Sequence, residues 1–76
     1  MAKTIADRLC AGLLILGYER PAKRPANRYT MFVDPLGGYI YVGQRGALRR
    51  GPNVADSRPM SNVFYNRLME VANGQG

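Results

Sequence analysis

Two runs of β-forming residues in the middle of the chain, at 28–33 and 39–43, are separated by the segment Asp34-Pro35-Leu36-Gly37-Gly38. Tyrosine, valine, isoleucine and phenylalanine favour strands, whereas aspartate, proline and glycine are typical of tight turns. The pattern therefore predicts an antiparallel β-hairpin. A chain of 76 residues is long enough for one domain only, so we expect this hairpin to form part of a single core.

The register of the hairpin decides which side chains share a face of the sheet. If Leu36 and Gly37 form a two-residue turn, Val33 faces Ile40. The core face then holds Tyr29, Met31, Val33, Ile40 and Val42, and the other face holds Phe32, Tyr39 and Tyr41. In the alternative register Val33 faces Tyr39, which mixes aliphatic and aromatic side chains. We expect the first register.

Amphipathic helical patterns flank the hairpin. The first has apolar residues three or four positions apart, and it begins with Thr4 and Asp7, which resemble a capping box. The second follows Ser61, a suitable N-cap residue, and keeps the same spacing. We therefore expect helices at Thr4–Leu16 and Ser61–Ala72.

A short run after the hairpin, Ala47–Arg50, is a candidate third strand, and we expect a loop from there through Pro59. The sequence thus predicts a single α+β domain in the order α-β-β-(β)-α, with two helices packed on a two- or three-stranded antiparallel sheet. The predicted core consists of Ile5, Leu9, Leu13, Leu16, Met31, Val33, Ile40, Val42, Leu48, Phe64, Leu68 and Val71.

The basic residues are mostly arginine, and most of them fall into two clusters. Nine of the eleven are arginine, and with five acidic residues the formal net charge is +6. One cluster precedes the hairpin and the other follows it: Arg20, Lys23, Arg24 and Arg28, then Arg45, Arg49, Arg50 and Arg58. A guanidinium group binds two phosphate or carboxylate oxygens at once. The clusters indicate contact with a polyanion, although a solvated basic face has the same composition.

Two further features lie beside these arginines. The segment Gly43-Gln44-Arg45-Gly46 has the GxxG spacing of KH domains, but KH domains place that loop between two helices. We therefore interpret it as either an anion-binding nest or a plain turn. The aromatic residues Phe32, Tyr39 and Tyr41 either stack on nucleic-acid bases from an uncovered sheet face or pack beneath a helix.

Catalysis and metal binding have little support in the sequence. There is no histidine, and Cys10 is the only cysteine, so we expect neither a disulfide nor a usual zinc site. Asp34 and Asp56 are the candidates for a magnesium site, but turn and loop roles explain them more simply. We expect a non-enzymatic protein without cofactors.

The N-terminal apolar run favours a cytoplasmic protein rather than a secreted or membrane protein. The run at 9–16 is too short to cross a bilayer. The residues that follow it lack the small-residue pattern of a signal-peptide cleavage site. We therefore expect no membrane contact and a location in the cytoplasm.

The segment Tyr39–Gly51 reads YIYVGQRGALRRG. It resembles a segment of small uncharacterised phage and prophage proteins, in which an aromatic strand runs into a Gly-Ala-Leu-Arg loop. The resemblance implies a phage-type origin and the cytoplasm of a host cell. It carries no assigned activity.

These observations lead to two hypotheses about function. In the first, the protein is an accessory protein that binds the nucleic-acid backbone through the two arginine clusters, with Phe32, Tyr39 or Tyr41 stacking on bases. In the second, it is a protein-interaction module, either a homodimer or an inhibitor of a host enzyme. Its interface would then be the strongly apolar first helix and the aromatic sheet face.

Overall fold

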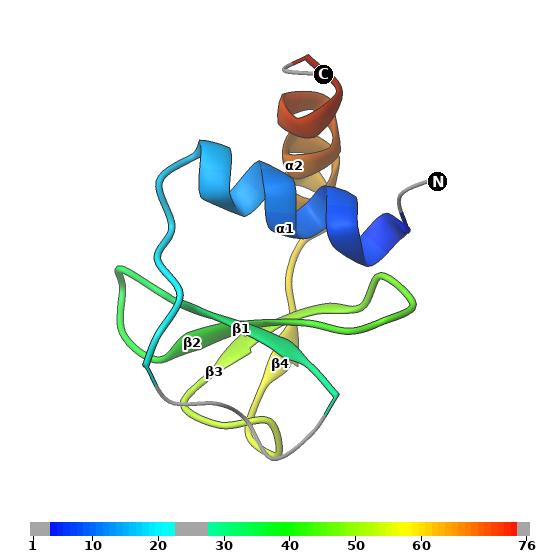
Figure 1. Ribbon diagram of the computed structural model, residues 1–76. Coiled ribbons are helices and arrows are strands. Elements are labelled where there is room, and N and C mark those ends of the chain that lie inside the picture. Colours follow the sequence, from blue (N-terminus) through cyan, green and yellow to red (C-terminus); the bar gives the residue numbers. More distant parts are fainter. Residues whose placement is uncertain (1–3, 23–27, 75–76) are drawn as a thin grey trace.

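The computed structural model describes residues 4–22 and 28–74. Its two helices and four strands follow the order α-β-β-β-β-α (Figure 1). They are α1 (Ile5–Ile15), β1 (Thr30–Val33), β2 (Tyr39–Val42), β3 (Leu48–Gly51), β4 (Arg58–Pro59) and α2 (Asn62–Gly74). The strands form one antiparallel sheet in chain order, and both helices lie on the same side of it. The predicted α+β class is confirmed.

Both helices begin at the capping residues that the sequence indicates. Thr4 Oγ1 accepts a hydrogen bond from the Asp7 amide at 3.1 Å, and Asp7 Oδ2 accepts one from the Thr4 amide at 3.2 Å. Ser61 Oγ accepts a hydrogen bond from the Phe64 amide at 3.3 Å at the start of α2. Gly17, with φ 93°, adopts the left-handed conformation that commonly ends a helix. Neither described helix is long and apolar enough to cross a membrane.

The two helices pack closely where Gly12 of α1 meets Leu68 of α2. A Cβ atom at Gly12 would lie 2.6 Å from the Leu68 carbonyl oxygen, which is closer than two such atoms can approach. Glycine therefore lets the two backbones meet at this point. The contact holds α1 and α2 together as one layer above the sheet.

The β1–β2 hairpin forms as predicted, but its register is the alternative one, so the preferred register is wrong. Val33 pairs with Tyr39, and Phe32 pairs with Ile40. A shift of one residue turns every side chain of β1 to the other face relative to β2. Phe32 therefore lies with Ile40 on the face that the helices cover.

The turn explains this register. The Asp34 amide donates a hydrogen bond to the Gly38 carbonyl at 3.1 Å, and the Gly37 amide donates one to the Asp34 carbonyl at 2.9 Å. Asp34 Oδ1 also accepts a hydrogen bond from the Leu36 amide at 3.0 Å. An aspartate side chain that accepts a hydrogen bond from the amide two residues later stabilises an Asx turn. The closing pair is thus Asp34 and Gly38, and the turn is longer than the predicted two residues.

The core lies between the sheet and the two helices. It is formed by Leu9, Leu13, Phe32, Ile40, Val42, Leu48 and Leu68, all of them buried. The prediction that Ile5 and Val33 belong to the core is wrong, because Ile5 is 46% exposed and Val33 is 37% exposed. Ile5 lies in the first turn of α1, and the register directs Val33 away from the helices. Met31 is buried as predicted, on the face away from the helices, while Leu16, Phe64 and Val71 are half-buried.

The strand β4 replaces part of the predicted loop. Arg58 pairs with Arg50, and Pro59 pairs with Arg49, at the edge of the sheet. An edge is where a sheet accepts proline, because proline cannot donate a ladder hydrogen bond. Arg49 also donates hydrogen bonds from Nε to Ser57 Oγ at 2.8 Å and from Nη2 to the Ser57 carbonyl at 2.6 Å. A strand of two residues carries no periodicity that the sequence could reveal.

Candidate nucleic-acid interface

The turn between β2 and β3 holds Arg45 at the surface of the protein. The Gly43 amide donates a hydrogen bond to the Ala47 carbonyl at 2.8 Å, and the Gly46 amide donates one to the Gly43 carbonyl at 3.0 Å. Gly46 has φ 90°, and a Cβ atom there would lie 2.7 Å from Cγ2 of Ile5. The turn is therefore compact and packs against the first residue of α1. Anion binding by its amides stays a prediction.

A pocket of about 300 Å³ lies where this turn meets the residues that precede β1. Its lining consists of Arg28, Tyr29, Gly43, Gln44, Arg45 and Ala47, and we call it the Tyr29 pocket. Arg28 belongs to the first predicted arginine cluster and Arg45 to the second, and both are exposed. The fold thus brings one arginine of each cluster to the pocket that the half-buried Tyr29 lines.

Tyr29 belongs to a row of three tyrosines. The ring centroids of Tyr29 and Tyr41 are 6.0 Å apart with an interplanar angle of 73°, and those of Tyr39 and Tyr41 are 6.4 Å apart. Tyr41 is buried between the other two, and this burial raises the pKa of its hydroxyl, with a further contribution from Tyr39. Tyr29 and Tyr39 are only half-buried. They are the two rings of the row that retain exposed surface.

Phe32 does not belong to this row, so the prediction that it shares a face with Tyr39 and Tyr41 is wrong. Its ring is fully buried beneath the helices, whereas Tyr39 and Tyr41 lie on the opposite face. The register described above separates them, because adjacent cross-strand pairs point to opposite faces. Phe32 could reach a base only if the helices moved away.

Arg20 and Arg49, which the sequence assigns to the interface, make contacts within the protein. Arg20 Nε donates a hydrogen bond to the Met31 carbonyl at 3.0 Å, and its guanidinium carbon lies 5.4 Å from the centre of the Phe32 ring. Arg49 binds Ser57 through two of its nitrogen atoms. Both arginines therefore stabilise the fold, and part of their hydrogen-bonding capacity is already used.

Arg50 and Arg58 face each other across β3 and β4. Arg50 forms an ion pair with Asp34, with 2.6 Å between Nη2 and Oδ2, whereas Arg58 is exposed. The two remaining basic residues of the first cluster, Lys23 and Arg24, lie outside the described residues. The structure thus brings together Arg28 and Arg45 around one pocket and gives Arg20, Arg49 and Arg50 structural contacts.

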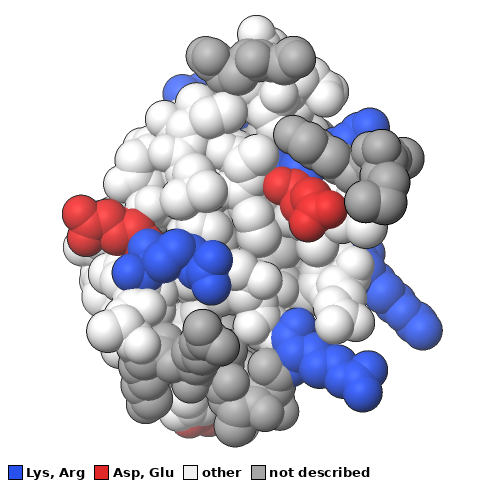
Figure 2. Space-filling model, viewed as in Figure 1, with Lys and Arg blue, Asp and Glu red and all other residues white. Residues whose placement is uncertain are grey.

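The surface charge next to the Tyr29 pocket is basic. Figure 2 shows Lys and Arg side chains extending from the side of the molecule where the β2–β3 turn projects in Figure 1. Within the described ranges, neither Arg28 nor Arg45 forms an ion pair with an acid. Asp34 is paired with Arg50, and Asp56 accepts a hydrogen bond from Asn53.

Residues 4–22 and 28–74 contain no group of three cysteine or acidic side chains placed to hold a metal ion. The thiol of Cys10 is partly buried in α1. Burial raises its pKa and outweighs a hydrogen bond with Thr30 and the charge of Arg20, which lower it. The thiol is therefore protonated at neutral pH and is a poor nucleophile.

Comparison with known proteins finds no match. No family model matches the chain, and neither a curated protein nor a solved structure does. The phage-type resemblance of residues 39–51 stays a prediction. The Tyr29 pocket is the candidate site, and the sequence assigns its aromatic residue to the core face instead.

Proposed function

We propose that this protein binds nucleic acid through the Tyr29 pocket. Arg28 and Arg45 would contact backbone phosphates, and the ring of Tyr29 would stack on a base. The observation that supports the proposal is the convergence of two exposed arginines, distant in sequence, on one half-buried tyrosine ring. Nucleic acid presents complementary groups, because it carries negatively charged phosphates along its backbone and a flat base on each nucleotide.

The physical chemistry of the pocket suits a single strand better than a duplex. A base that stacks on a tyrosine must be unpaired or at the end of a helix, and such stacking contributes about 1–3 kcal/mol per base. A guanidinium group binds phosphate through two parallel hydrogen bonds, which also orients the backbone. The proposal therefore describes a non-enzymatic accessory protein with a preference for single-stranded DNA or RNA. It places this activity in the cytoplasm, where Cys10 would stay reduced.

Fluorescence anisotropy with a labelled single-stranded oligonucleotide and its matching duplex tests the proposal. We expect binding to the single strand at about 50 mM salt and a loss of affinity by orders of magnitude at higher ionic strength. The double variant Arg28→Ala/Arg45→Ala should lower the slope of log affinity against log salt by roughly 1.4, since each single-strand phosphate contact contributes about 0.7.

A matched control separates the pocket from net charge. The variant Arg8→Ala/Arg67→Ala removes the same charge from exposed positions on the two helices, on the other side of the sheet from the tyrosine row. We expect it to retain most of the affinity. If both double variants bind equally well, or if the unmodified protein does not bind at low salt, the proposal is wrong.

In the protein-interaction alternative, the part of the interface that the sequence assigns to the first helix draws little support from the structure. Ile5, Leu14 and Ile15 of α1 are exposed. Ile5 and Leu14 are nine positions apart in sequence, which places them about 180° apart around the helix axis. These residues therefore do not form one continuous apolar stripe. A concentration-dependent dimer in sedimentation experiments, without nucleic-acid binding, would favour this alternative.

A further inference from the structure

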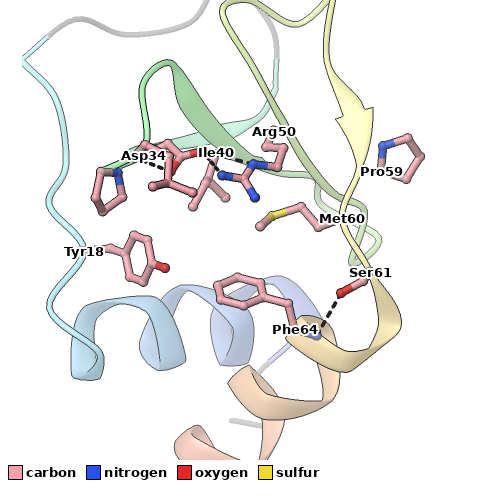
Figure 3. A pocket seen from close by; sticks show the side chains of 10 residues that line it. Tyr18, Asp34, Ile40, Arg50, Pro59, Met60, Ser61 and Phe64 are labelled. Atoms are coloured by element: carbon pink, nitrogen blue, oxygen red, sulfur yellow. Dashed lines mark hydrogen bonds and ion pairs between the residues drawn. The ribbon is translucent and has the colours of Figure 1, made fainter.

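A second cavity lies between the sheet and α2, and it shares no residue with the Tyr29 pocket. It has a volume of about 560 Å³. Its walls come from the β1–β2 turn, β2, β3, the β4–α2 junction, α2 and the segment after α1 (Figure 3). Cavities of this size are in the range that small ligands occupy in proteins. We call it the Arg50 cleft, after the arginine that lines it.

The guanidinium of Arg50 is held in a fixed orientation at the wall of the cleft. Its Nε and Nη2 donate hydrogen bonds to Asp34 Oδ2 at 3.1 and 2.6 Å. The Asp34 side chain is only 4% exposed and is itself held by the Leu36 amide, whereas the Arg50 side chain is 41% exposed. Among the described residues, Arg50 Nη1 makes no hydrogen bond. A rigid donor with unused hydrogen atoms therefore faces the cavity (Figure 3).

The electrostatic balance of the cleft favours an anion. Asp34 is the only acidic residue among those that line it, and Arg50 neutralises its charge. Arg58, directly across from Arg50 in the β3–β4 pairing, adds a second positive charge nearby. The cleft also contains Ser61 at the start of α2, whose first turn has no acidic residue. A helix N-terminus of this kind adds to the positive potential.

The rest of the cleft is apolar and aromatic. Tyr18 and Phe64 pack edge to face, with ring centroids 6.1 Å apart, and Met60 lies beside them in Figure 3. Ile40 forms a buried part of the wall. Leu36 also lines the cleft, yet it is 84% exposed. An apolar ligand would cover part of Leu36 and remove that surface from water.

We infer that the Arg50 cleft binds a small carboxylate that carries an aromatic body. The carboxylate accepts hydrogen bonds from Arg50 Nη1, and the aromatic body lies against Met60 and Phe64. A monoanion fits better than a phosphate dianion, because Asp34 already neutralises Arg50, and only Arg58 and the start of α2 add positive potential. The carboxylate can belong to a free small molecule or to the C-terminal residue of a peptide, since both present the same group.

Titrations monitored by two-dimensional ¹H–¹⁵N NMR test this inference on the whole chain. The probes are N-acetyl-phenylalanine, its uncharged amide, phenyl phosphate and a short peptide that ends in phenylalanine. We expect N-acetyl-phenylalanine to shift the signals of Leu36, Phe64 and Arg50 Nε, and the amide to bind about tenfold more weakly or worse. The free acid and the peptide distinguish the two sources of the carboxylate. Equal affinity for the acid and the amide, or tighter binding of phenyl phosphate, overturns the inference.

Two sets of variants locate the ligand. The variant Asp34→Asn/Arg50→Gln replaces the ion pair with a neutral pair, and we expect it to lose about tenfold or more in affinity for the acid. Leu36→Ser removes an exposed apolar side chain that lines the cleft, and should weaken binding severalfold. Val63→Ser is the control, because Val63 is 80% exposed and does not line the cleft. If Leu36→Ser and Val63→Ser bind the acid equally well, the cleft is not the site.

Discussion

Arg50 donates two hydrogen bonds to the same carboxylate oxygen of Asp34, and the two residues differ in exposure by about a factor of ten. Asp34 is buried at the β1–β2 turn, whereas Arg50 reaches it from β3. The pair thus connects the turn to a strand that follows it in sequence. It also gives a structural role to an arginine that the sequence assigns to phosphate binding.

The difference in exposure predicts an asymmetric response to mutation. Arg50→Ala leaves a buried carboxylate without its cationic partner, and we expect the free energy of unfolding to fall by about 2–3 kcal/mol. Asp34→Asn leaves a half-exposed guanidinium that water can solvate, and the amide oxygen can still accept from Leu36. We expect a loss of about 1 kcal/mol. Urea denaturation of both variants checks the order, and a larger loss for Asp34→Asn contradicts it.

The helix contact at Gly12 predicts a second stability effect. Gly12→Ala places a methyl group 2.6 Å from the Leu68 carbonyl oxygen, so α1 and α2 must separate. We expect a loss of about 1–3 kcal/mol, as is typical of overpacked sites. Gly74→Ala is the control, since a Cβ atom there meets nothing within 4 Å. That variant should be neutral or slightly stabilising, because alanine favours helix over glycine. Thermal unfolding of the two variants gives the comparison.

The local elements of this fold could be predicted because each has its own sequence signal. Thr4 and Asp7 cap α1 through their own side chains, and Ser61 caps α2 in the same way. These interactions involve neighbours in sequence, so a pattern of a few residues contains them. The hairpin strands follow from composition for the same reason.

The register and the interface depend on contacts that no short pattern contains. The turn at Asp34 is stabilised partly by Arg50, which lies 16 positions away. The register then decides that Phe32 is covered by the helices and that Tyr41 is not. In the same way, Arg28 and Arg45 meet at one pocket because the pairing of Thr30 with Val42 brings the residues that precede β1 beside the β2–β3 turn. The two arginine clusters are visible in the sequence. Which arginine of each cluster lines the pocket beside Tyr29 is visible only in the fold.

The buried hydroxyl of Tyr41 and the thiol of Cys10 predict a loss of stability in alkali. Burial raises the pKa of both groups in the folded protein, above ordinary values of 10.0 and 9.0. Between the unfolded and the folded pKa, the unfolded chain holds fewer protons, so the free energy of unfolding falls as pH rises. The stability from this effect is fully present below the unfolded pKa and is lost as pH passes through the folded pKa.

Urea denaturation at neutral pH and near pH 10 measures this loss. Tyr41→Phe and Cys10→Ala each remove one titrating group, so each variant should lose less stability between the two pH values than the unmodified protein does. The double variant should lose least. An unchanged difference between the two pH values in the double variant would rule out this origin of the alkaline sensitivity.

The Tyr29 pocket predicts that the aromatic ring, and not the hydroxyl, contributes to binding of a single strand. Tyr29→Ala should weaken binding to a single-stranded oligonucleotide by about 1–3 kcal/mol, which is roughly fivefold to 150-fold, and Tyr29→Phe should bind almost normally. Tyr39→Ala is the matched control, because Tyr39 contacts the same Tyr41 ring but does not line the pocket. Anisotropy titrations at fixed salt give the three affinities. Equal losses for Tyr29→Ala and Tyr39→Ala would show that sheet packing, and not a base stacked in the pocket, explains the effect.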